Sequence, residues 1–237
     1  MKAMILAAGE GTRLRPLTLE RPKPMLPIGG KPLLEHIIDL LKRHGIREMA
    51  INLHYKPEVV MDYFGHGQRF GVEITYSVED PILGTAGAVK KLQDYFNDTF
   101  LVIYGDLLTN MDITSLVEYH QIKEGMVTVA LYRVENPSAC GIVELSGEGR
   151  IRRFVEKPPP EEVFTDLANA GVYIVESEVL DYIPPETFYD FGQDLFPVML
   201  EKGVPIYGYP IDDYLIDIGT LEKYERAQRE WRMVNGR

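Results

Sequence analysis

A glycine-rich stretch with interspersed cations lies near the start of the chain, directly after an apolar run. Residues 7–24 read Ala-Ala-Gly-Glu-Gly-Thr-Arg-Leu-Arg-Pro-Leu-Thr-Leu-Glu-Arg-Pro-Lys-Pro, and the run Lys2–Leu6 before them predicts a buried strand. A glycine-rich turn after a strand presents several backbone N–H groups at one point, where they can face an anion. Together with the cations Arg13 and Lys23, the stretch predicts a polyphosphate site.

Two common phosphate loops do not fit this stretch. The dinucleotide fingerprint needs a third glycine, but Gly9 and Gly11 are followed by Leu14 at that position. The Walker A loop needs Gly-Lys followed by Ser or Thr, and the chain has Gly11-Thr12-Arg13 instead. An NAD-dependent enzyme and a P-loop nucleotide hydrolase are therefore disfavoured.

The stretch resembles the N-terminal signature of the sugar-1-phosphate nucleotidylyltransferases, above all that of mannose-1-phosphate guanylyltransferase catalytic domains. That signature, Gly-x-Gly-Thr-Arg-x-x-Pro-x-Thr followed by Lys-Pro, is matched at every defined position. The resemblance implies an enzyme that makes an NDP-sugar and pyrophosphate from an NTP and a sugar 1-phosphate. It implies that Arg13 contacts the leaving phosphates and Lys23 the α-phosphate. The nucleotide-binding residues that it implies are Leu6, Ala8, Gly9, Gly11, Thr12, Arg13, Lys23, Glu79, Gly84 and Thr85.

Two aspartates follow apolar runs later in the chain. Asp106 ends Val-Ile-Tyr-Gly-Asp, and Asp217 lies in Leu-Ile-Asp-Ile-Gly-Thr. Ligand-binding residues of open α/β sheets lie at the carboxyl ends of strands. The resemblance implies that both carboxylates hold Mg²⁺, a hard cation that takes oxygen ligands and bridges phosphates. Alone, either residue would equally suit a strand end or a helix cap.

The second half of the chain carries motifs that resemble the family's sugar-phosphate site. Lys157 is expected to neutralise the attacking phosphate, and Glu156 to accept hydrogen bonds from sugar hydroxyls. An exposed ion pair between these two remains the alternative. The sugar-phosphate residues implied by the resemblance are Gly141, Glu156, Lys157, Asn169 and Asp194.

The segment from Glu79 to Gly87, Glu-Asp-Pro-Ile-Leu-Gly-Thr-Ala-Gly, resembles the base-recognition segment of the family. Its Leu-Gly-Thr-Ala-Gly form favours GTP and mannose 1-phosphate as substrates, and the Glu79 carboxylate could accept from the N–H groups of guanine. A thymidylyl- or uridylyltransferase acting on glucose 1-phosphate or another sugar 1-phosphate remains the alternative. A catalytically silent nucleotide-sugar-binding regulatory subunit is the second rival, although Arg13, Lys23, Asp106 and Asp217 argue against it.

Other chemistries find little support in the sequence. Asp190-Phe191-Gly192 resembles a kinase motif, but no His-Arg-Asp or Ala-Pro-Glu element accompanies it. The five histidines have no metal-ligand spacing, and the single cysteine, Cys140, has no evident base beside it. Covalent catalysis is therefore not indicated, and a sugar phosphate already carries an anionic nucleophile.

Composition limits the class of partner. The 237 residues carry 25 basic and 36 acidic side chains, a formal net charge of −11, which disfavours a nucleic-acid surface. Anionic substrates must then be held by a few local cations and a metal. One cysteine and no apolar run of about 20 residues predict a cytoplasmic protein without membrane partners. An assembly of identical chains is left open.

Strand-like runs alternate with amphipathic patterns in the first half, which predicts an α/β protein with a parallel sheet. The resemblance implies one Rossmann-like, three-layer α/β/α domain over residues 1–237, with a mixed, mostly parallel sheet and no C-terminal left-handed β-helix. The predicted strands are Lys2–Leu6, Glu48–Leu53, Val72–Val78, Phe100–Tyr104, Val127–Val134, Gly141–Leu145, Ile151–Val155, Asn169–Val175 and Pro205–Tyr209. The predicted helices are Pro32–His44, Pro57–Phe64, Thr85–Tyr95, Ile113–Glu124 and Leu221–Val234.

Overall fold

The computed structural model describes residues 1–234, which divide into two compact units that alternate along the chain. Unit 1 comprises Met1–Ile82, Ile103–Asp112 and the chain from Asp213 onward, and unit 2 comprises Leu83–Val102 and Ile113–Asp212. The single domain predicted over 1–237 stays a prediction, and its last three residues lie outside the described part.

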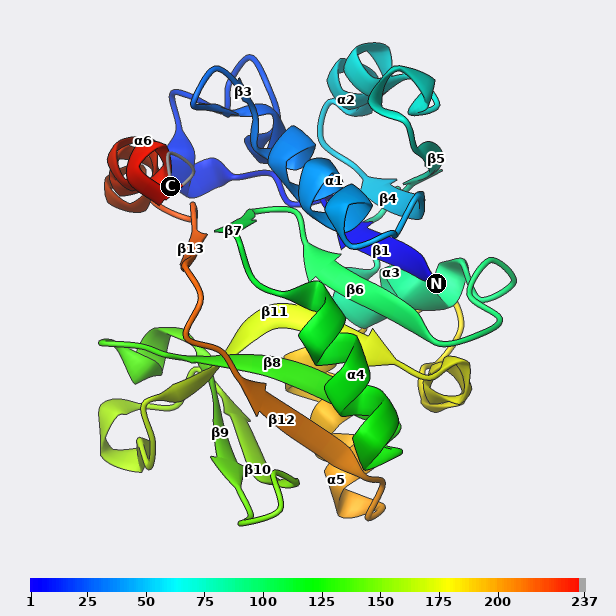
Figure 1. Cartoon of the computed structure of the whole chain (residues 1–237), viewed down its shortest axis with the longest axis vertical. Coiled ribbons are helices and arrows are strands. Elements are labelled where there is room, and N and C mark those ends of the chain that lie inside the picture. Colours follow the sequence, from blue (N-terminus) through cyan, green and yellow to red (C-terminus); the bar gives the residue numbers. More distant parts are fainter. Residues whose placement is uncertain (235–237) are drawn as a thin grey trace. The chain divides into compact units, whose positions relative to one another are not determined.

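Unit 1 is built on parallel strands that lie side by side in the order β1, β4, β5 (Figure 1). Helices connect them, as the alternation in the sequence predicts. Its principal elements are β1 (Lys2–Leu6), β2 (Pro27–Ile28), β3 (Lys31–Pro32), α1 (Leu33–Arg43), β4 (Glu48–Leu53), α2 (Pro57–Phe64), β5 (Glu73–Val78), β7 (Leu107–Thr109), β13 (Leu215–Asp217) and α6 (Leu221–Val234).

Apolar patterning explains these elements. Strand β4 is buried from Met49 to Leu53, as expected for a central strand covered on both faces. Helix α1 buries its Leu and Ile positions on one side and keeps its charges on the other. It ends at Arg43, and Gly45 then turns the chain at φ +80°, a conformation that suits glycine.

A second group of apolar side chains joins segments that are distant in the sequence. Leu14, from the glycine-rich loop, packs in the same buried cluster as Leu108 of β7, Ile216 of β13 and Trp231 of α6. We call this group, which also contains Leu26, Ile28, Leu33, Ile218 and Ala227, the loop-side core. Its burial holds together the segments that carry the predicted nucleotide and metal residues.

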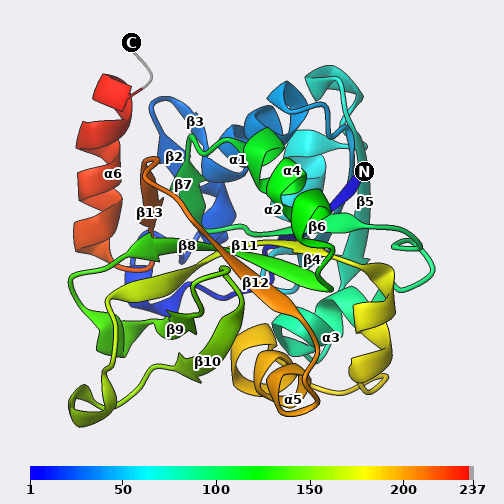
Figure 2. The ribbon, with the colours of Figure 1, turned by 60° about the horizontal axis from the view of Figure 1, so that its bottom comes forward.

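Unit 2 contains a mixed sheet in the order β10, β9, β11, β8, β12 (Figure 2). Strand β12 runs parallel to β8, and the other pairs are antiparallel. Strand β6 (Phe100–Tyr104) is divided between the units, its first three residues belonging to unit 2. The remaining principal elements of unit 2 are α3 (Gly84–Lys91), α4 (Ile113–Lys123), β8 (Val127–Arg133), β9 (Gly141–Leu145), β10 (Ile151–Glu156), β11 (Leu167–Val175), α5 (Phe196–Glu201) and β12 (Ile206–Pro210).

The predicted elements are all present, some with the predicted bounds and others with shifted ends. The largest shift is in α3, which ends at Lys91 and not at Tyr95. Beyond Lys91 the chain continues in tighter turns, because Gln93 and Tyr95 donate to carbonyls three residues earlier. Five short elements were not predicted, namely β2, β3, β7, β13 and α5.

The observed class is α/β with a mixed, mostly parallel sheet, as predicted. Residues 1–234 contain no left-handed β-helix. No helix among these residues combines the length and the apolar character needed to span a membrane.

Candidate active site

The glycine-rich loop leaves the carboxyl end of β1 and folds back on itself. Gly11 has φ +64°, and a Cβ there would lie 3.0 Å from the Cβ of Lys23. The Thr18 hydroxyl donates to the Gly11 carbonyl at 2.9 Å. Gly11 is thus required both for its backbone conformation and for the close passage of the Lys23 segment.

Lys23 lies in a short 3-10 turn that begins after Pro22. The residue is only 9% exposed, and its Nζ donates to the Asp106 carboxylate at 2.5 Å. Pairing with a carboxylate offsets the cost of burying a lysine side chain. Two residues predicted for the same site, 83 positions apart in the chain, are therefore in direct contact.

One of the two predicted metal ligands, Asp106, lies in the turn directly before β7 of unit 1, and the other, Asp217, ends β13, which pairs with β7. Asp217, the last residue of β13, faces Leu107 of β7, and the Ile218 N–H donates to the Asp106 carbonyl at 3.0 Å. Ile216 and Ile218 both point into the loop-side core. Since side chains alternate along a strand, Asp217 is turned away from that core.

Arg13 and Asp217 meet at Gly219. A Cβ on Gly219 would lie 2.7 Å from Asp217 Oδ1 and 3.4 Å from Arg13 Nη2. The Gly219 N–H donates to Asp217 Oδ1 at 3.1 Å, and Lys223 of α6 pairs with Oδ2. The sequence interpretation missed Gly219 and Lys223, although Gly219 stands in the Asp-Ile-Gly-Thr run that was singled out.

The carboxylates of Asp106 and Asp217 are the two ligands that this site offers to a Mg²⁺ ion, and oxygen ligands suit that ion. Residues 1–234 hold no group of three or more His, Cys, Asp or Glu side chains that could bind a metal. Mg²⁺ commonly uses one or two carboxylates and completes its shell with waters and substrate phosphates. Asp106 and Asp217 therefore fit a magnesium ion that arrives with a nucleotide. The magnesium site stays a prediction.

Glu79, predicted at the base, is buried in unit 1 and 1% exposed. Its Oε1 accepts from Asn52 Nδ2 at 2.9 Å, and Asn52 Oδ1 accepts from the Ala7 N–H at 2.7 Å. The structure thus joins Glu79 to the start of the loop through a residue that the sequence interpretation did not consider. The contact with a base stays a prediction.

Gly84 and Thr85 lie at the start of α3 in unit 2. Gly84 has φ +75°, and a Cβ there would lie 2.7 Å from the Tyr189 carbonyl oxygen. The Thr85 N–H and hydroxyl both donate to Asp190 Oδ1, and the same hydroxyl accepts from the Phe191 N–H. These contacts fasten the Asp-Phe-Gly segment to α3, so that segment has a structural role here.

Gly141, Glu156 and Lys157 come together at the end of β10. A Cβ on Gly141 would lie 2.5 Å from Glu156 Oε2, and one on Gly192 would lie 2.7 Å from it. Lys157 has φ +48°, a left-handed conformation that a lysine rarely adopts, and its Nζ lies 3.3 Å from Glu156 Oε1. Backbone conformations of this kind cluster at functional sites. The Lys157 side chain is 61% exposed and therefore accessible to a phosphate.

Asn169 and Asp194 contact their own segments. Asn169 Oδ1 accepts from the Gly171 N–H and Nδ2 donates to the Tyr173 hydroxyl, across an irregularity in β11. Asp194 Oδ2 accepts from the Asp190 N–H at 2.7 Å. No contact in the described residues joins either one to Glu156 or Lys157, so their sugar contacts stay predictions.

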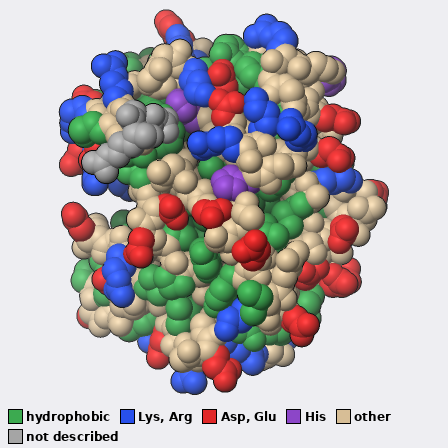
Figure 3. All heavy atoms as spheres, viewed as in Figure 1, with side chains coloured by type: hydrophobic (Ala, Val, Ile, Leu, Met, Phe, Trp, Pro, Cys, Tyr) green, Lys and Arg blue, Asp and Glu red, His purple; other side chains and the backbone are tan. Residues whose placement is uncertain are grey.

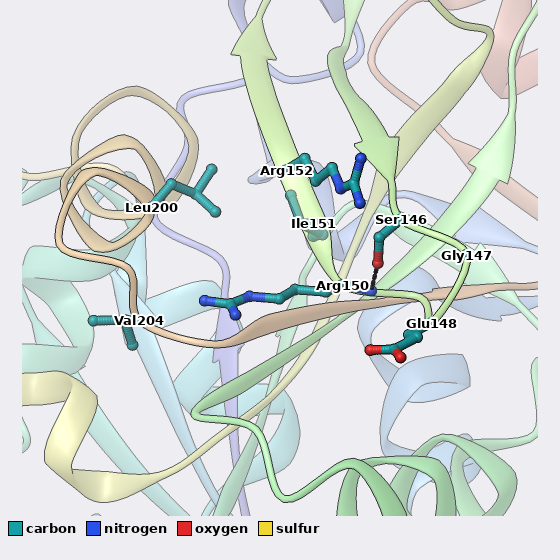
Figure 4. Close-up of a pocket in the computed structure, with 8 residues that line it drawn as sticks. All are labelled: Ser146, Gly147, Glu148, Arg150, Ile151, Arg152, Leu200 and Val204. Carbon is teal, nitrogen blue, oxygen red and sulfur yellow. Dashed lines mark hydrogen bonds between the residues drawn. The ribbon is translucent and has the colours of Figure 1, made fainter.

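A separate hollow of about 600 Å³ lies in unit 2 between the β9–β10 hairpin and the end of α5 (Figure 4). The Arg150 guanidinium, which lines it, donates to the Gly203 carbonyl at 2.8 Å. No predicted site residue is among its lining residues, which are Ser146, Gly147, Glu148, Arg150, Ile151, Arg152, Leu200 and Val204.

Comparison with known proteins gives a consistent result. A family described as nucleotidyl transferase matches residues 2–233. A UTP–glucose-1-phosphate uridylyltransferase from Synechocystis is 43% identical, over 97% of this chain and 63% of its own length. A mannose-1-phosphate guanylyltransferase from Mycobacterium tuberculosis is 39% identical, over 96% of this chain and 64% of its own length. The chain thus spans somewhat less than two thirds of these relatives.

Solved structures agree with the sequence comparison. One from Bacillus anthracis, described as a glucose-1-phosphate thymidylyltransferase in complex with sucrose, superimposes with a TM-score of 0.89 at 30% identity. The similarity covers 98% of this chain and 95% of that one. The predicted family resemblance is therefore confirmed over nearly the whole chain, and the α/β fold with it.

Proposed function

Because the chain belongs to the nucleotidyl transferase family, we propose that it forms an NDP-sugar and pyrophosphate from an NTP and a sugar 1-phosphate. The observation that carries the proposal is the contact of Lys23 with Asp106 in unit 1, where Arg13 and Asp217 also both lie close to Gly219. Cations and carboxylates at one place suit a magnesium-bound polyphosphate.

In the proposed reaction, a phosphate oxygen of the sugar 1-phosphate attacks the α-phosphorus of the NTP. The bond from that phosphorus to the bridging oxygen breaks, and pyrophosphate leaves with the electron pair. Arg13 binds the leaving phosphates, Lys23 stabilises negative charge on the α-phosphate, and Lys157 neutralises the attacking phosphate. Mg²⁺, when held by Asp106 and Asp217, neutralises phosphate charge. No base is needed, because the nucleophile is already an anion.

For the substrates we propose GTP and mannose 1-phosphate. The support is the Leu-Gly-Thr-Ala-Gly segment at 83–87 and the guanylyltransferase relative from Mycobacterium tuberculosis. UTP and glucose 1-phosphate are the second candidate pair, favoured by the 43% identical relative from Synechocystis. The cytoplasmic location stays a prediction, and an assembly of identical chains stays open.

A matrix of NTPs against common sugar 1-phosphates, with Mg²⁺ and a pyrophosphate readout, tests the proposal. We expect pyrophosphate release that depends on both substrates and is highest for GTP with mannose 1-phosphate. Highest release for UTP with glucose 1-phosphate would transfer the assignment to the second pair. No release for any combination, together with binding of an NDP-sugar, would identify a silent regulatory subunit instead.

A further inference from the structure

A short chain of buried hydrogen bonds runs beneath the start of the phosphate loop. The Glu79 carboxylate accepts from Asn52 Nδ2 at 2.9 Å, and Asn52 Oδ1 accepts from the Ala7 N–H at 2.7 Å. Glu79 is 1% exposed and Asn52 3% exposed. Buried hydrogen bonds of this kind are costly to break, because water does not replace the lost partner.

The two groups that contact Asn52, the Ala7 N–H and the Glu79 carboxylate, determine the orientation of its side-chain amide. A backbone N–H can only donate, so the atom beside Ala7 must be the amide oxygen. The amide nitrogen then faces Glu79, whose Oε1 accepts from it. Further contacts fix Glu79 itself, because its N–H donates to the Leu53 carbonyl and its carbonyl contacts His54 Nδ1 at 2.8 Å. Asn52 is therefore held in one orientation.

Ala7 is the first residue of the loop that follows β1. Strand β1 ends at Leu6, which is paired in register with Asn52 of β4. The next N–H, that of Ala7, donates to the Asn52 side chain in place of a strand partner. The direction of this N–H influences the direction of the following N–H groups at Ala8 and Gly9, two of the residues that the sequence predicts to bind the nucleotide.

We propose that Asn52 is a positioning residue for the phosphate loop, kept in orientation by the buried carboxylate of Glu79. It acts through the Ala7 N–H and does not itself touch the nucleotide. The inference rests on the proposed function, because it requires that the glycine-rich loop bind the phosphates of the NTP, as the sequence predicts. The inference adds that the affinity of the loop for phosphates depends on the side chain of Asn52, on the neighbouring strand β4. This dependence should hold for pyrophosphate, which has no base, as well as for an NTP.

Ser77 supplies a matched control in the same layer of the sheet. It is the register partner of Asn52 on β5 and is 5% exposed. Its hydroxyl has no hydrogen-bond partner among the described residues. Removing that hydroxyl deletes a buried polar atom next to Asn52 without breaking the chain of hydrogen bonds.

We use pyrophosphate to measure phosphate binding by the loop, because it has neither a base nor a sugar that could bind elsewhere. For Asn52→Ala we expect the pyrophosphate inhibition constant and the KM for NTP to rise about tenfold, the effect of one lost hydrogen bond. The KM for the sugar 1-phosphate should stay within about twofold, since only the loop is disturbed. Ser77→Ala should leave all three constants unchanged. Thermal unfolding of each variant excludes global unfolding as the cause.

Exchanging the carboxylate and the amide tests the direction of the hydrogen bonds. Asn52→Asp places two carboxylates against each other and should weaken pyrophosphate binding at least as much as Asn52→Ala. Glu79→Gln alone should have a small effect on pyrophosphate binding, because pyrophosphate has no base for Glu79 to contact and a glutamine oxygen still accepts from Asn52. In the double variant, Asn52→Asp with Glu79→Gln, the new glutamine donates to the new aspartate, whose second oxygen accepts from Ala7. We expect pyrophosphate affinity to recover.

Amide hydrogen exchange gives a readout that needs no substrate. Exchange at Ala7 should accelerate in Asn52→Ala and be slow again in the double variant, while exchange at Ile5, within β1, should not change. Wild-type pyrophosphate affinity in Asn52→Ala, or no recovery in the double variant, would overturn the inference and leave the proposed function standing. A wild-type protein that binds neither pyrophosphate nor NTP would defeat both.

Discussion

Lys23 and Arg13 are cations of the same unit with different surroundings. Lys23 is nearly withdrawn from water and contacts Asp106, whereas Arg13 is exposed and lies beside Gly219 and Asp217. A lysine presents a compact charge, and an arginine presents a fork that can hold two phosphate oxygens. Their placement agrees with the separate roles proposed for them, on the α-phosphate and on the leaving phosphates.

Replacing Lys23 should affect catalysis more than stability. For Lys23→Met we expect kcat to fall by roughly 100-fold to 1,000-fold, the usual effect of removing a group that neutralises transition-state charge. Lys31→Met is the control, because Lys31 pairs with Asp39 in the same unit, outside the predicted site. Steady-state kinetics and thermal unfolding of both variants provide the measurement. An unchanged kcat in Lys23→Met would remove Lys23 from the mechanism.

Arg13 and Arg15 allow a comparison within one loop. Arg13→Ala should lower kcat/KM for the NTP by roughly 10-fold to 100-fold, because a contact to the leaving phosphates is lost. Within residues 1–234, the only ion pair of the Arg15 side chain is an exposed one with Glu10 at 3.8 Å, and such pairs contribute little to stability. Arg15→Ala should therefore behave like the wild type. Equal losses in the two variants would contradict the assignment of the phosphate contact to Arg13.

At the scale of elements, β7, β13 and α6 position the carboxylates. The loop-side core takes Leu108 from β7, Ile216 from β13 and Trp231 from α6, so it holds all three elements against the loop. Trp231 also donates from Nε1 to His36 Nδ1 at 3.2 Å, and His36 Nε2 contacts the Ile28 carbonyl at 2.8 Å. These contacts tie the last helix to the first.

The contact between α6 and α1 should depend on pH. The Trp231 N–H requires an unprotonated Nδ1 on His36, and burial of the ring lowers the pKa of His36 below its ordinary value of 6.5. Below its ordinary pKa, His36 is therefore protonated more readily in the unfolded chain than in the native protein. The free energy of unfolding should be constant, as far as this group is concerned, above pH 6.5 and should fall as the pH drops below it.

Urea unfolding between neutral and mildly acidic pH measures this effect. His44 adds to it in the same direction, since burial also lowers the pKa of that ring. The difference between the wild type and His36→Asn isolates the contribution of His36, because His44 is common to both. An identical pH dependence in the two proteins would show that the contact does not respond to protonation.

At the scale of the whole molecule, a formal net charge of −11 opposes the binding of anionic substrates. Figure 3 shows acidic and basic side chains interspersed over the face that it draws. Binding of an NTP must therefore depend on local cations and on a metal that shields phosphate charge. The same requirement would apply to a sugar 1-phosphate.

Removing Mg²⁺ should abolish activity and leave the fold intact. The described residues contain only a two-carboxylate donor set at the site and no larger cluster of potential ligands, so a structural metal is not indicated. With excess EDTA we expect pyrophosphate release to stop and to return when Mg²⁺ is restored. Far-UV circular dichroism and the melting temperature should not change. Unfolding by the chelator would indicate a structural metal instead.

Local patterns were sufficient to predict the glycine-rich loop, the buried strands and the amphipathic helices. Each depends on residues close together in the chain, such as the apolar run of β1 or the glycine after α1. The predicted end of α3 was wrong because hydrogen bonding in the following turns, and not apolar spacing, ends that helix. The family match followed from the same local motifs.

Only the tertiary structure determined which distant residues meet. Strand β13 is three residues long and pairs with β7, so its sequence has no periodicity that could predict the partner beside Asp217. Glu79 directly follows β5, so the register of β4 and β5 brings it to Asn52. The register of β1 and β4 sets Asn52 opposite Leu6, at the start of the loop. Strand register and buried hydrogen bonds depend on the packing of the whole unit. The sequence therefore specifies the chemical groups, and the fold specifies their partners.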